Sequence, residues 1–418
     1  MKSTPINALQ VECVDPPLHI RRQYLSDRFL FKIFQYSYHP LIGKLHTLSQ
    51  LVSTSNYWSH KEIPCLLVSY LKLTRLPCPV FQCTLNPLFS TPFNAITFVP
   101  KVLLNLPIEK GSSSANSQFK SIIDQHFRDW LLVFTDASKL SDDGCVGAAV
   151  WIPKVNVVLN FKLPPSSSVY TGEVLAIYEA ILFIESHGLS NSIILSDSKS
   201  ALEGLMANQF CNKFRTPLIL KIKQLLLRCH LQNINVVLAW IPSHSGITGN
   251  ESVDAYAKEA VTTGTLTHYQ LYCQDLIPVA KKHLYITWNR EWASSSNVKG
   301  KHYFDIQSEV PVRPWFFKYS QNSKIVCSTV CRVRLGHCCS PVFLEKIRVK
   351  DSSLCECGLD EGTLDHIFFC CPKNQSSLYD LLPINIPRPI NFKSILCYVN
   401  TSFIDILCTF IRSNNIKL

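Results

Sequence analysis

The sequence is poor in glycine and has no long uninterrupted hydrophobic run. Glycine numbers 14 in 418 residues, which excludes a collagen-like chain, and no heptad pattern persists, which excludes a long coiled coil. The most apolar stretches, Ile63–Leu73 and Ile395–Ile411, are too short or are interrupted by Lys72 and Asp405, so no membrane span is predicted. The N-terminus also lacks the apolar core of a signal peptide. We therefore expect an intracellular protein, in the cytoplasm, the nucleus or both, that is not secreted and does not bind a membrane.

Hydrophobic residues and cysteines are plentiful. Hydrophobic residues make up 47% of the chain and aromatic residues 11%, which is enough for packed cores and excludes wholesale disorder. The length indicates two to three domains. Of the 18 cysteines, ten lie between Cys327 and Cys408. In a large chain that is not secreted, such cysteines are typical of free thiols or metal ligands rather than of a disulfide framework.

The net charge of +11 is unevenly distributed along the chain. Residues 1–130 carry 13 Lys+Arg and 7 Asp+Glu, which gives +6, and residues 266–418 carry 18 and 12, which again gives +6. Residues 131–265 carry 10 and 11, which gives −1. A nearly neutral centre between basic flanks suits a carboxylate site whose neighbours hold a polyanion, although this overall charge is also common in proteins without such a partner.

The central part of the sequence alternates between strand and helix patterns. The predicted strands are 131–134, 145–152, 155–163, 192–195 and 234–240, and the predicted helices are 170–187, 198–208, 217–229 and 250–261. This order predicts an α/β fold, a mixed five-stranded sheet with helices on both faces. A polar segment at 111–117 precedes it and is predicted to be a linker, and a helix is predicted at 20–38.

Three acidic residues fall where burial disfavours a charge. Asp136 ends an apolar strand, Glu173 lies in the first turn of an amphipathic helix, and Asp197 follows another apolar strand. Each alone is more typical of a helix N-cap, and Asp197 before Ser198 is a good N-cap candidate. Together with Asp254 on the last helix, they form a set of oxygen ligands typical of a hard divalent cation, which would offset their mutual repulsion.

A histidine-bearing loop follows the last predicted strand. The segment Trp240–Asp254 contains the end of that strand, a proline turn, a glycine-bearing loop with His244, and the start of a helix. A loop histidine beside carboxylates can transfer protons near neutral pH. We therefore interpret His244 as a catalytic candidate, whereas an isolated loop histidine would more often have no role.

Four segments carry a resemblance to a known family. FTDASK (134–139), YTGEVLAI (170–177), LSDSKSAL (195–202) and WIPSHSGITGNESVDAYAKEA (240–260) closely resemble the type 1 ribonuclease H domain, in the version found in non-LTR retrotransposons. The resemblance implies a ribonuclease H-like fold over residues 128–265, with mainly helical flanking regions. Two positions depart from the family pattern: Ala137 stands where glycine is common, and Gly172 where alanine is usual.

The resemblance also implies the chemistry. Asp136, Glu173, Asp197 and Asp254 would be carboxylate ligands of two Mg²⁺ ions, with Mn²⁺ as a substitute, and His244 the mobile proton carrier. The implied activity is endonucleolytic hydrolysis of the RNA strand of RNA–DNA hybrids. Contacts to successive 2′-hydroxyl groups or to the adjoining backbone would select RNA. The candidates for these contacts are Ser138, Asn208 and Asn250, and the basic flanks would add affinity for the nucleic acid backbone.

A cysteine and histidine cluster lies near the C-terminus. Cys355, Cys357, His366 and Cys371 have the spacing C-x-C…H-x₄-C, which suits a tetrahedral Zn²⁺ ion. Cys370 is an alternative to Cys371, and structural cysteines without metal are an alternative to the whole site. Segments 331–338 and 355–372 look like the Cys/His tail that follows ribonuclease H in these retrotransposons.

The N-terminal part resembles a different piece of the same elements. Residues 9–22 are similar to the segment that follows the reverse transcriptase palm, but no Tyr-x-Asp-Asp motif occurs, so no polymerase activity is expected. The predicted regions are a reverse-transcriptase-derived tail at 1–110, a linker at 111–127, the ribonuclease H domain at 128–265, a basic helical region at 266–350 and a Cys/His tail at 351–418.

Three functional hypotheses follow from these patterns. The first is a metal-dependent ribonuclease H of retrotransposon origin. The second is a catalytically silent nucleic-acid-binding remnant, which the intact set of carboxylates disfavours. The third is another nuclease or a transposase on the same fold, which Glu173 and the loop carrying His244 disfavour.

Overall fold

The computed structural model describes residues 4–76, 80–83, 87–211, 217–266, 271–319, 324–383, 390–397, 401–416 and 418. The chain divides into two compact units. Unit 1 consists of Met1–Arg22 and Lys282–Leu418, and unit 2 consists of Gln23–Lys281. The division falls inside helices α2 (Leu18–Phe34) and α12 (Leu276–Ser296). Unit 1 is therefore built from both ends of the chain.

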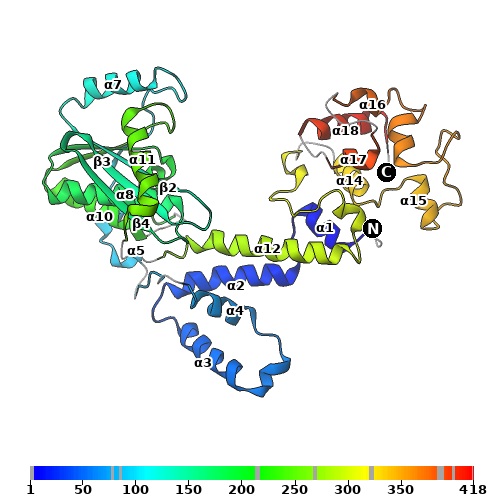
Figure 1. Cartoon of the computed structure of the whole chain (residues 1–418), viewed down its shortest axis with the longest axis horizontal. Coiled ribbons are helices and arrows are strands. Elements are labelled where there is room, and N and C mark those ends of the chain that lie inside the picture. Colours follow the sequence, from blue (N-terminus) through cyan, green and yellow to red (C-terminus); the bar gives the residue numbers. More distant parts are fainter. Residues whose placement is uncertain are drawn as a thin grey trace. The chain divides into compact units, whose positions relative to one another are not determined.

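Unit 2 contains a mixed β-sheet (Figure 1). Its strands are β1 (Lys101–Leu103), β2 (Leu131–Lys139), β3 (Val146–Ile152), β4 (Val157–Leu163), β5 (Asn191–Ser196), β6 (Asn235–Trp240) and β7 (Thr265–Leu266). In the described residues the order across the sheet is β1-β6-β5-β2-β3-β4-β7. Strand β2 pairs in parallel with β5 and antiparallel with β3, so it lies at the junction of the parallel and antiparallel halves.

The α/β fold class predicted from the sequence is confirmed, with two additions to the sheet. The five predicted strands correspond to β2–β6. Strand β1 adds to β6 in parallel, and β7 adds to β4 in parallel. These strands have three and two residues, too short to show a period of two in the sequence. Because β1 belongs to the sheet, residues 101–103 are structurally part of unit 2's α/β core rather than of a separate N-terminal region.

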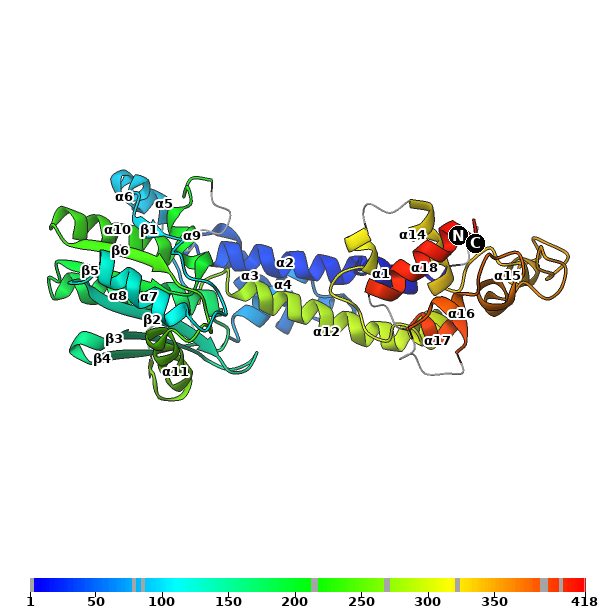
Figure 2. The same cartoon turned by 90° about the horizontal axis from the view of Figure 1, so that it is seen from above.

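Helices cover both faces of the sheet (Figures 1 and 2). One face packs against α8 (Val169–Ser186), α9 (Lys199–Met206) and α10 (Pro217–Leu231). The opposite face packs against α7 (Ala115–His126) and α11 (Thr248–Thr263). Alternation along β2 explains the two layers, since Val133 enters the first core and Phe134 the second.

The segment predicted to be a linker at 111–127 contains helix α7. Ala115, Phe119 and Ile123 of this helix are buried against the sheet. The polar residues before α7 account for the linker-like composition of residues 111–127. The apolar residues of α7 are spaced i, i+4 and i+8, so they lie on one face of the helix and become part of the core.

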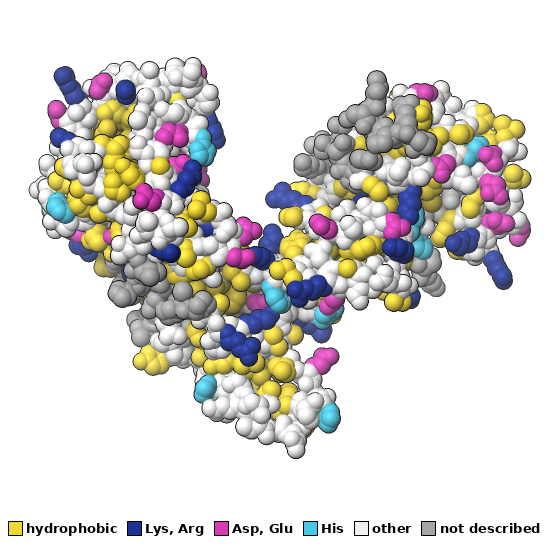
Figure 3. Space-filling view, viewed as in Figure 1, with side chains coloured by type: hydrophobic (Ala, Val, Ile, Leu, Met, Phe, Trp, Pro, Cys, Tyr) yellow, Lys and Arg dark blue, Asp and Glu magenta, His cyan; other side chains and the backbone are white. Residues whose placement is uncertain are grey.

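The rest of unit 2 is a helical arm formed by α2, α3 (Pro40–Thr54), η1 (Asn56–His60) and α4 (Cys65–Leu73), followed by short helices α5 (Pro87–Ser90) and α6 (Phe93–Thr97). Helix α2 confirms the helix predicted at 20–38. The buried carboxylate of Asp27 accepts hydrogen bonds from Ser69 Oγ (2.5 Å) and Gln23 Nε2 (2.8 Å) and ties α2 to α4. In Figure 3, lysine and arginine side chains gather over α2 and α4, which agrees with the predicted basic character of this flank.

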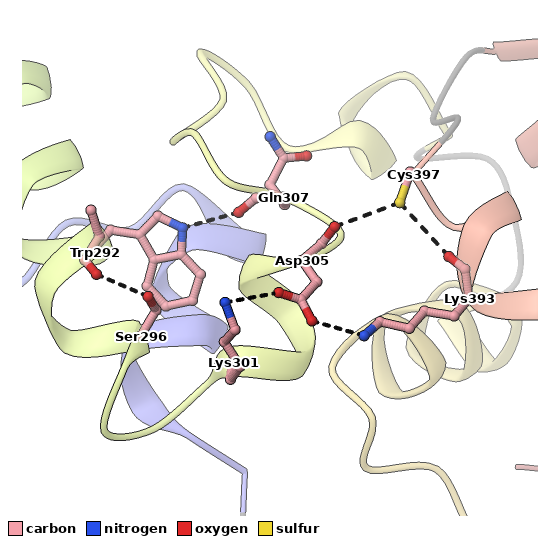
Figure 4. A network of polar contacts seen from close by, with 8 residues as sticks. Trp292, Ser296, Lys301, Asp305, Gln307, Lys393 and Cys397 are labelled. Carbon is pink, nitrogen blue, oxygen red and sulfur yellow. Dashed lines mark hydrogen bonds and ion pairs between the residues drawn. The ribbon is translucent and has the colours of Figure 1, made fainter.

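Unit 1 is mainly helical. Its elements are α1 (Ile6–Cys13), the rest of α12, α13 (Lys301–Phe304), η3 (Trp315–Tyr319), α14 (Lys324–Arg334), α15 (Pro341–Lys346), η4 (His366–Cys370), α16 (Leu378–Leu381), α17 (Phe392–Ile395) and α18 (Thr401–Ser413). Asp305 receives ion pairs from Lys301 (3.2 Å) and Lys393 (2.9 Å), which join α13 to α17 (Figure 4). No helix among the described residues combines the length and the apolar character needed to cross a membrane.

A buried ion pair joins the two ends of the chain inside unit 1. Glu12 of α1 and Arg334 of α14 are 1% and 2% exposed, with 3.0 Å between Glu12 Oε1 and Arg334 Nε. The Glu12 carboxylate also accepts hydrogen bonds from Tyr303 Oη (2.5 Å) and Trp315 Nε1 (2.7 Å). These partners satisfy both charges and make α1 an integral part of the C-terminal unit.

Candidate functional site

Two predicted site residues, Asp136 and Asp197, lie at adjacent positions on neighbouring parallel strands or directly after them. In the pairing of β2 with β5, Thr135 lies opposite Ser196. Asp197 directly follows β5, whereas β2 continues through Asp136, which pairs with Ala149, to Lys139. The expectation that Asp136 ends its strand is therefore wrong. The parallel register nevertheless places Asp136 beside Asp197.

Glu173 reaches this edge from helix α8. The residue before it, Gly172, lies so close to the sheet that a Cβ atom there would be 2.8 Å from Ala137 Cβ and 2.7 Å from Val146 Cγ1. Glycine thus permits the first turn of α8 to approach β2 and β3 closely. The two departures from the family pattern, Ala137 and Gly172, face each other in this contact.

The three carboxylates form one cluster. Asp136, Glu173 and Asp197 each offer an oxygen atom, and these atoms lie within 4.8 Å of one another. Asp136 and Glu173 are 6% and 7% exposed, and Asp197 is half-buried. Asp136 Oδ1 accepts a hydrogen bond from the Ala137 N–H group (2.8 Å). We call this cluster the carboxylate triad.

Neighbouring side chains hold Asp197. Asn250 Nδ2 donates to Asp197 Oδ2 over 3.3 Å, and Trp240 Nε1 donates to the Asp197 carbonyl oxygen over 3.1 Å. The N-cap position of α9 is occupied by Ser198. The described contacts of the Asp197 carboxylate thus point to the triad rather than to the N-cap role that the sequence had also allowed.

Burial and mutual repulsion shift the acidity of the triad. The pKa of Asp136 is raised to about 7, chiefly by burial and then by the charge of Asp197, while hydrogen bonds from Ala137 and Glu173 oppose the shift. The pKa of Glu173 is raised well above its usual range by burial and by Asp136, and burial also raises the pKa of Asp197. Without a cation the triad therefore holds protons at pH values where isolated carboxylic acids are ionised.

The other two predicted residues form a second group with a residue that the sequence reasoning missed. His244, Glu251 and Asp254 each offer a ligand atom, and these atoms lie within 4.8 Å of one another. Glu251 Oε1 also accepts from the Gly246 N–H group of the loop (3.3 Å). The negative charge of Asp254 raises the pKa of both Asp136 and Asp197, so this group adjoins the triad. In Figure 3 acidic, histidine and lysine or arginine side chains lie together beside α11.

Helix α11 carries Glu251 and Asp254 close to the sheet. A Cβ atom at Gly147 of β3 would be 2.1 Å from the Ala257 carbonyl oxygen, so a glycine is needed there for the helix to approach. Asp254 Oδ2 is paired with Lys258 Nζ at 2.6 Å, one helical turn away. The spacing of 251 and 254 on one helical face was the signal in the sequence for Glu251.

The three predicted substrate contacts lie in different settings. Ser138 is half-buried near the end of β2, and Asn208 is exposed, with its Oδ1 accepting from the Phe210 N–H group (2.9 Å). Asn250 is 3% exposed and is engaged with Asp197. The structure thus places Asn250 beside the triad and Asn208 in a local turn.

The triad has the properties of a site for a divalent cation. Its ligands are all oxygen atoms, which Mg²⁺ and Mn²⁺ prefer. The Oε2 atom of Glu173 is buried and has no hydrogen-bond partner in the described part of the chain. A cation at this position would satisfy that atom and remove the repulsion that raises the pKa values of the triad.

The predicted C-terminal cluster is also assembled. Cys355, Cys357, His366 and Cys371 offer ligand atoms within 4.8 Å of one another. The Sγ atoms of Cys355 and Cys371 are 3.8 Å apart, and Cys357 Sγ lies 3.2 Å from His366 Nε2. Cys370 is exposed and is not among these four residues. Of the two alternatives at this position, the structure brings Cys371 into the cluster.

This cluster suits a soft divalent metal. A hydrogen bond from the Leu359 N–H group and one from His366 lower the pKa of Cys357 to about 7, while burial raises the pKa of Cys355 to about 11. His366 Nδ1 faces Asp360 Oδ2 at 3.6 Å, the outer partner that ligating histidines commonly have. Three sulfur atoms and one imidazole nitrogen are the donor set of a structural zinc site.

The triad lies in a segment that matches a known protein family. Residues 128–262, about a third of the chain, match the family model of RNase H. An RNase H domain thus lies within unit 2 and contains Asp136, Glu173, Asp197 and both residues of the second group on α11. No curated protein matches the chain.

Proposed function

We propose that the RNase H domain is a metal-dependent endonuclease that hydrolyses the RNA strand of RNA–DNA hybrids. The observation that carries the proposal is the buried carboxylate triad with its unpartnered Glu173 oxygen, located inside a segment that matches RNase H. RNA–DNA hybrids are accordingly the proposed substrate, and the basic flanks are proposed to hold the nucleic acid backbone.

Each residue has a proposed role. Two Mg²⁺ ions, or Mn²⁺ in their place, would activate a water molecule and stabilise the leaving oxygen of the phosphodiester. Asp136, Glu173 and Asp197 would hold these ions, with Asp254 as the fourth ligand. Asn250 fixes the orientation of Asp197 through its hydrogen bond. His244, on the loop before α11, would take up and release a proton beside Asp254.

The pairing of Asp254 with Lys258 favours the second candidate function, a catalytically silent nucleic-acid-binding remnant. A ligand that is already paired with a lysine is less available to a metal. Lys258 is half exposed, however, and exposed pairs of this kind contribute less than about 1 kcal/mol. A divalent cation can therefore displace Lys258, and the endonuclease is the function that the geometry supports best.

The direct test is cleavage of a labelled RNA–DNA hybrid by the full chain with Mg²⁺, with Mn²⁺ and with EDTA. The variants are Asp136→Asn, which removes a charge from the triad, and Asp142→Asn, which makes the same chemical change at an exposed position of the same domain. We expect metal-dependent cutting of the RNA strand by the wild type and by Asp142→Asn, and none by Asp136→Asn. Absence of cutting by folded wild-type protein in either metal would favour the silent nucleic-acid-binding function.

Two further assignments extend the proposal. We infer that Cys355, Cys357, His366 and Cys371 hold a structural Zn²⁺ ion, because the four ligand atoms converge and their three sulfur atoms and one imidazole nitrogen are a donor set that zinc prefers. We also infer a retrotransposon origin, which rests on the resemblance of the RNase H segment and of the sequences that flank it. In that setting the enzyme would remove template RNA after reverse transcription.

A further inference from the structure

The first turn of α8, which carries Glu173, is held by a carboxylate from a distant part of the chain. Asp275 Oδ1 accepts hydrogen bonds from Thr171 Oγ1 (2.6 Å), Ser168 Oγ (2.7 Å) and the Ser168 N–H group (3.2 Å). Ser168 is the N-cap of α8. The contacts therefore fix the first turn of α8 at its N-cap Ser168 and at Thr171, two residues before Glu173.

Asp275 lies beyond the RNase H match, which ends at residue 262. It directly precedes α12, and the residues before it anchor it in unit 2. Leu271 and Tyr272 are 1% and 5% exposed, and the Leu271 carbonyl oxygen accepts from the Phe81 N–H group (2.8 Å). The position of Asp275 is thus fixed by packing and is not that of a mobile tail.

Burial of this carboxylate calls for compensation. Asp275 is 2% exposed. Its Oδ1 atom accepts the hydroxyl and N–H donors at the start of α8, and the Tyr272 backbone adds a further hydrogen bond to the carboxylate. Its Oδ2 atom is buried and has no hydrogen-bond partner in the described part of the chain. A buried carboxylate is costly unless several donors compensate it, and the N-terminus of a helix supplies donors and a positive dipole. Asp275 and the start of α8 therefore stabilise each other.

Lys139 of strand β2 holds the loop that leads into the first turn of α8. Lys139 Nζ donates to the carbonyl oxygens of Pro165 (2.7 Å) and Ser167 (3.2 Å), in the loop that leads into α8. Lys139 ends strand β2, three residues after Asp136. The start of α8 is thus fastened to the strand of Asp136 on one side and to Asp275 on the other.

We propose that Asp275 is a positioning residue for Glu173, so that the geometry of the carboxylate triad depends on a residue outside the RNase H segment. The proposal rests on the proposed function, in which the triad holds metal. Residues hydrogen-bonded directly to metal ligands change metal affinity or activity by about 10–100-fold when they are replaced. Asp275 acts through the first turn of α8 and not on the Glu173 side chain, so we expect an effect at the lower end of this range. Removal of the Asp275 carboxylate leaves the hydroxyl groups of Ser168 and Thr171 without this acceptor. The first turn of α8, which positions Glu173, is then less firmly held.

The test measures Mn²⁺ binding to the full chain by isothermal titration calorimetry, with Mn²⁺ alone as the ligand. Asp275→Ala should weaken Mn²⁺ binding by about tenfold or more. Asp275→Asn keeps an oxygen that accepts from Ser168 and Thr171 and should stay close to the wild type. In hybrid cleavage, Asp275→Ala should lower kcat with little change in KM, because substrate contacts do not depend on the aim of Glu173.

Asp27→Ala is the matched control. Asp27 is also a buried carboxylate of unit 2 that accepts a serine hydroxyl, but it lies in the helical arm and not at α8. The Asp27→Ala variant should have a lower free energy of unfolding and an unchanged affinity for Mn²⁺. If Asp275→Ala does not fold, Thr171→Val removes one donor of the same contact at nearly constant volume and should weaken Mn²⁺ binding.

The outcomes separate this inference from the proposed function. Wild-type affinity for Mn²⁺ in folded Asp275→Ala or Thr171→Val overturns the positioning role alone. Equal loss of affinity in Asp27→Ala also overturns it, since general destabilisation would then explain the effect. A folded wild type that binds no Mn²⁺ overturns the proposed function and this inference together.

Discussion

The contact between Gly172 of α8 and Ala137 of β2 determines how closely the helix that carries Glu173 approaches the strand that carries Asp136. A methyl group added at 172 would lie 2.8 Å from Ala137 Cβ and 2.7 Å from Val146 Cγ1. The family pattern has the methyl group on the opposite side of this contact, with glycine common at 137 and alanine usual at 172. We therefore expect Ala137 and Gly172 to be a compensating pair, which a double-mutant cycle can measure.

The magnitudes follow from the contact. Gly172→Ala should gain about 1 kcal/mol in helix propensity and lose about 1–3 kcal/mol to overpacking. Ala137→Gly should lose about 1–2 kcal/mol, since it removes a buried methyl group and places glycine in a strand. In the double variant one of the two close contacts is gone and the gain in propensity remains. The double variant should therefore be more stable than the sum of the single changes by about 1 kcal/mol.

The assay is amide hydrogen exchange of β2 and α8 in the full chain, which gives the free energy of opening of these elements separately from unit 1. Ile123→Ala, at a buried position of α7 on the opposite face of the sheet, serves as a control that should combine additively with Gly172→Ala. Additivity of the Ala137 and Gly172 changes within about 0.3–0.5 kcal/mol would refute the reasoning that the two methyl groups compete for one space.

Three other predictions concern unit stability, pH and metal. Glu12→Ala leaves the buried Arg334 without its carboxylate and should destabilise unit 1 by about 3–5 kcal/mol; an unchanged thermal midpoint of unit 1 would contradict this. The Arg228 guanidinium lowers the pKa of Glu185, so this pair stabilises the fold above the unfolded-state pKa of Glu185 and loses that contribution as the pH falls through the lower folded-state value. Glu185→Gln should therefore cost about 1 kcal/mol or less at neutral pH, because the Arg228 side chain is 54% exposed although that of Glu185 is 14% exposed, and nothing in acid; a cost that persists in acid would exclude the ion pair as its cause. Cys357→Ser should lower both the zinc content measured by atomic absorption and the thermal stability of unit 1, whereas Cys370→Ser should change neither; equal zinc content in the two variants would rule out the assigned ligand set.

Local patterns in the sequence were sufficient to predict the central strands and helices. The strands β3–β6 and the helices α8–α11 correspond closely to the predicted ranges, because their apolar residues repeat with the period of a strand or a helix and turn residues flank them. Strand β2 begins where predicted but continues five residues further, to Lys139, because it stays paired with β3. The grouping of Asp136, Glu173 and Asp197 was predicted from acidic residues at positions where burial disfavours a charge and from the resemblance to ribonuclease H, whereas the parallel pairing that brings Asp136 beside Asp197 became evident only from the sheet. The choice between Cys370 and Cys371 needed the structure, because both lie within reach of His366 along the chain.

Tertiary structure decided the features that depend on partners far along the chain. Strands β1 and β7 exist only because β6 and β4 offer free edges, and α7 is distinguished from a linker by the core that it covers. Asp275 follows the last strand of the sheet and carries no local signal of its role, which arises from hydrogen bonds to Ser168 and Thr171 more than 100 residues earlier. In the same way, only the buried pair of Glu12 and Arg334 shows that the first helix and the C-terminal region form one unit. Periodicity and side-chain type are local properties, so the sequence alone predicted most of the elements and the types of the ligands. Burial and hydrogen bonding depend on the folded chain, so the tertiary structure was needed to show how distant segments hold those ligands in place.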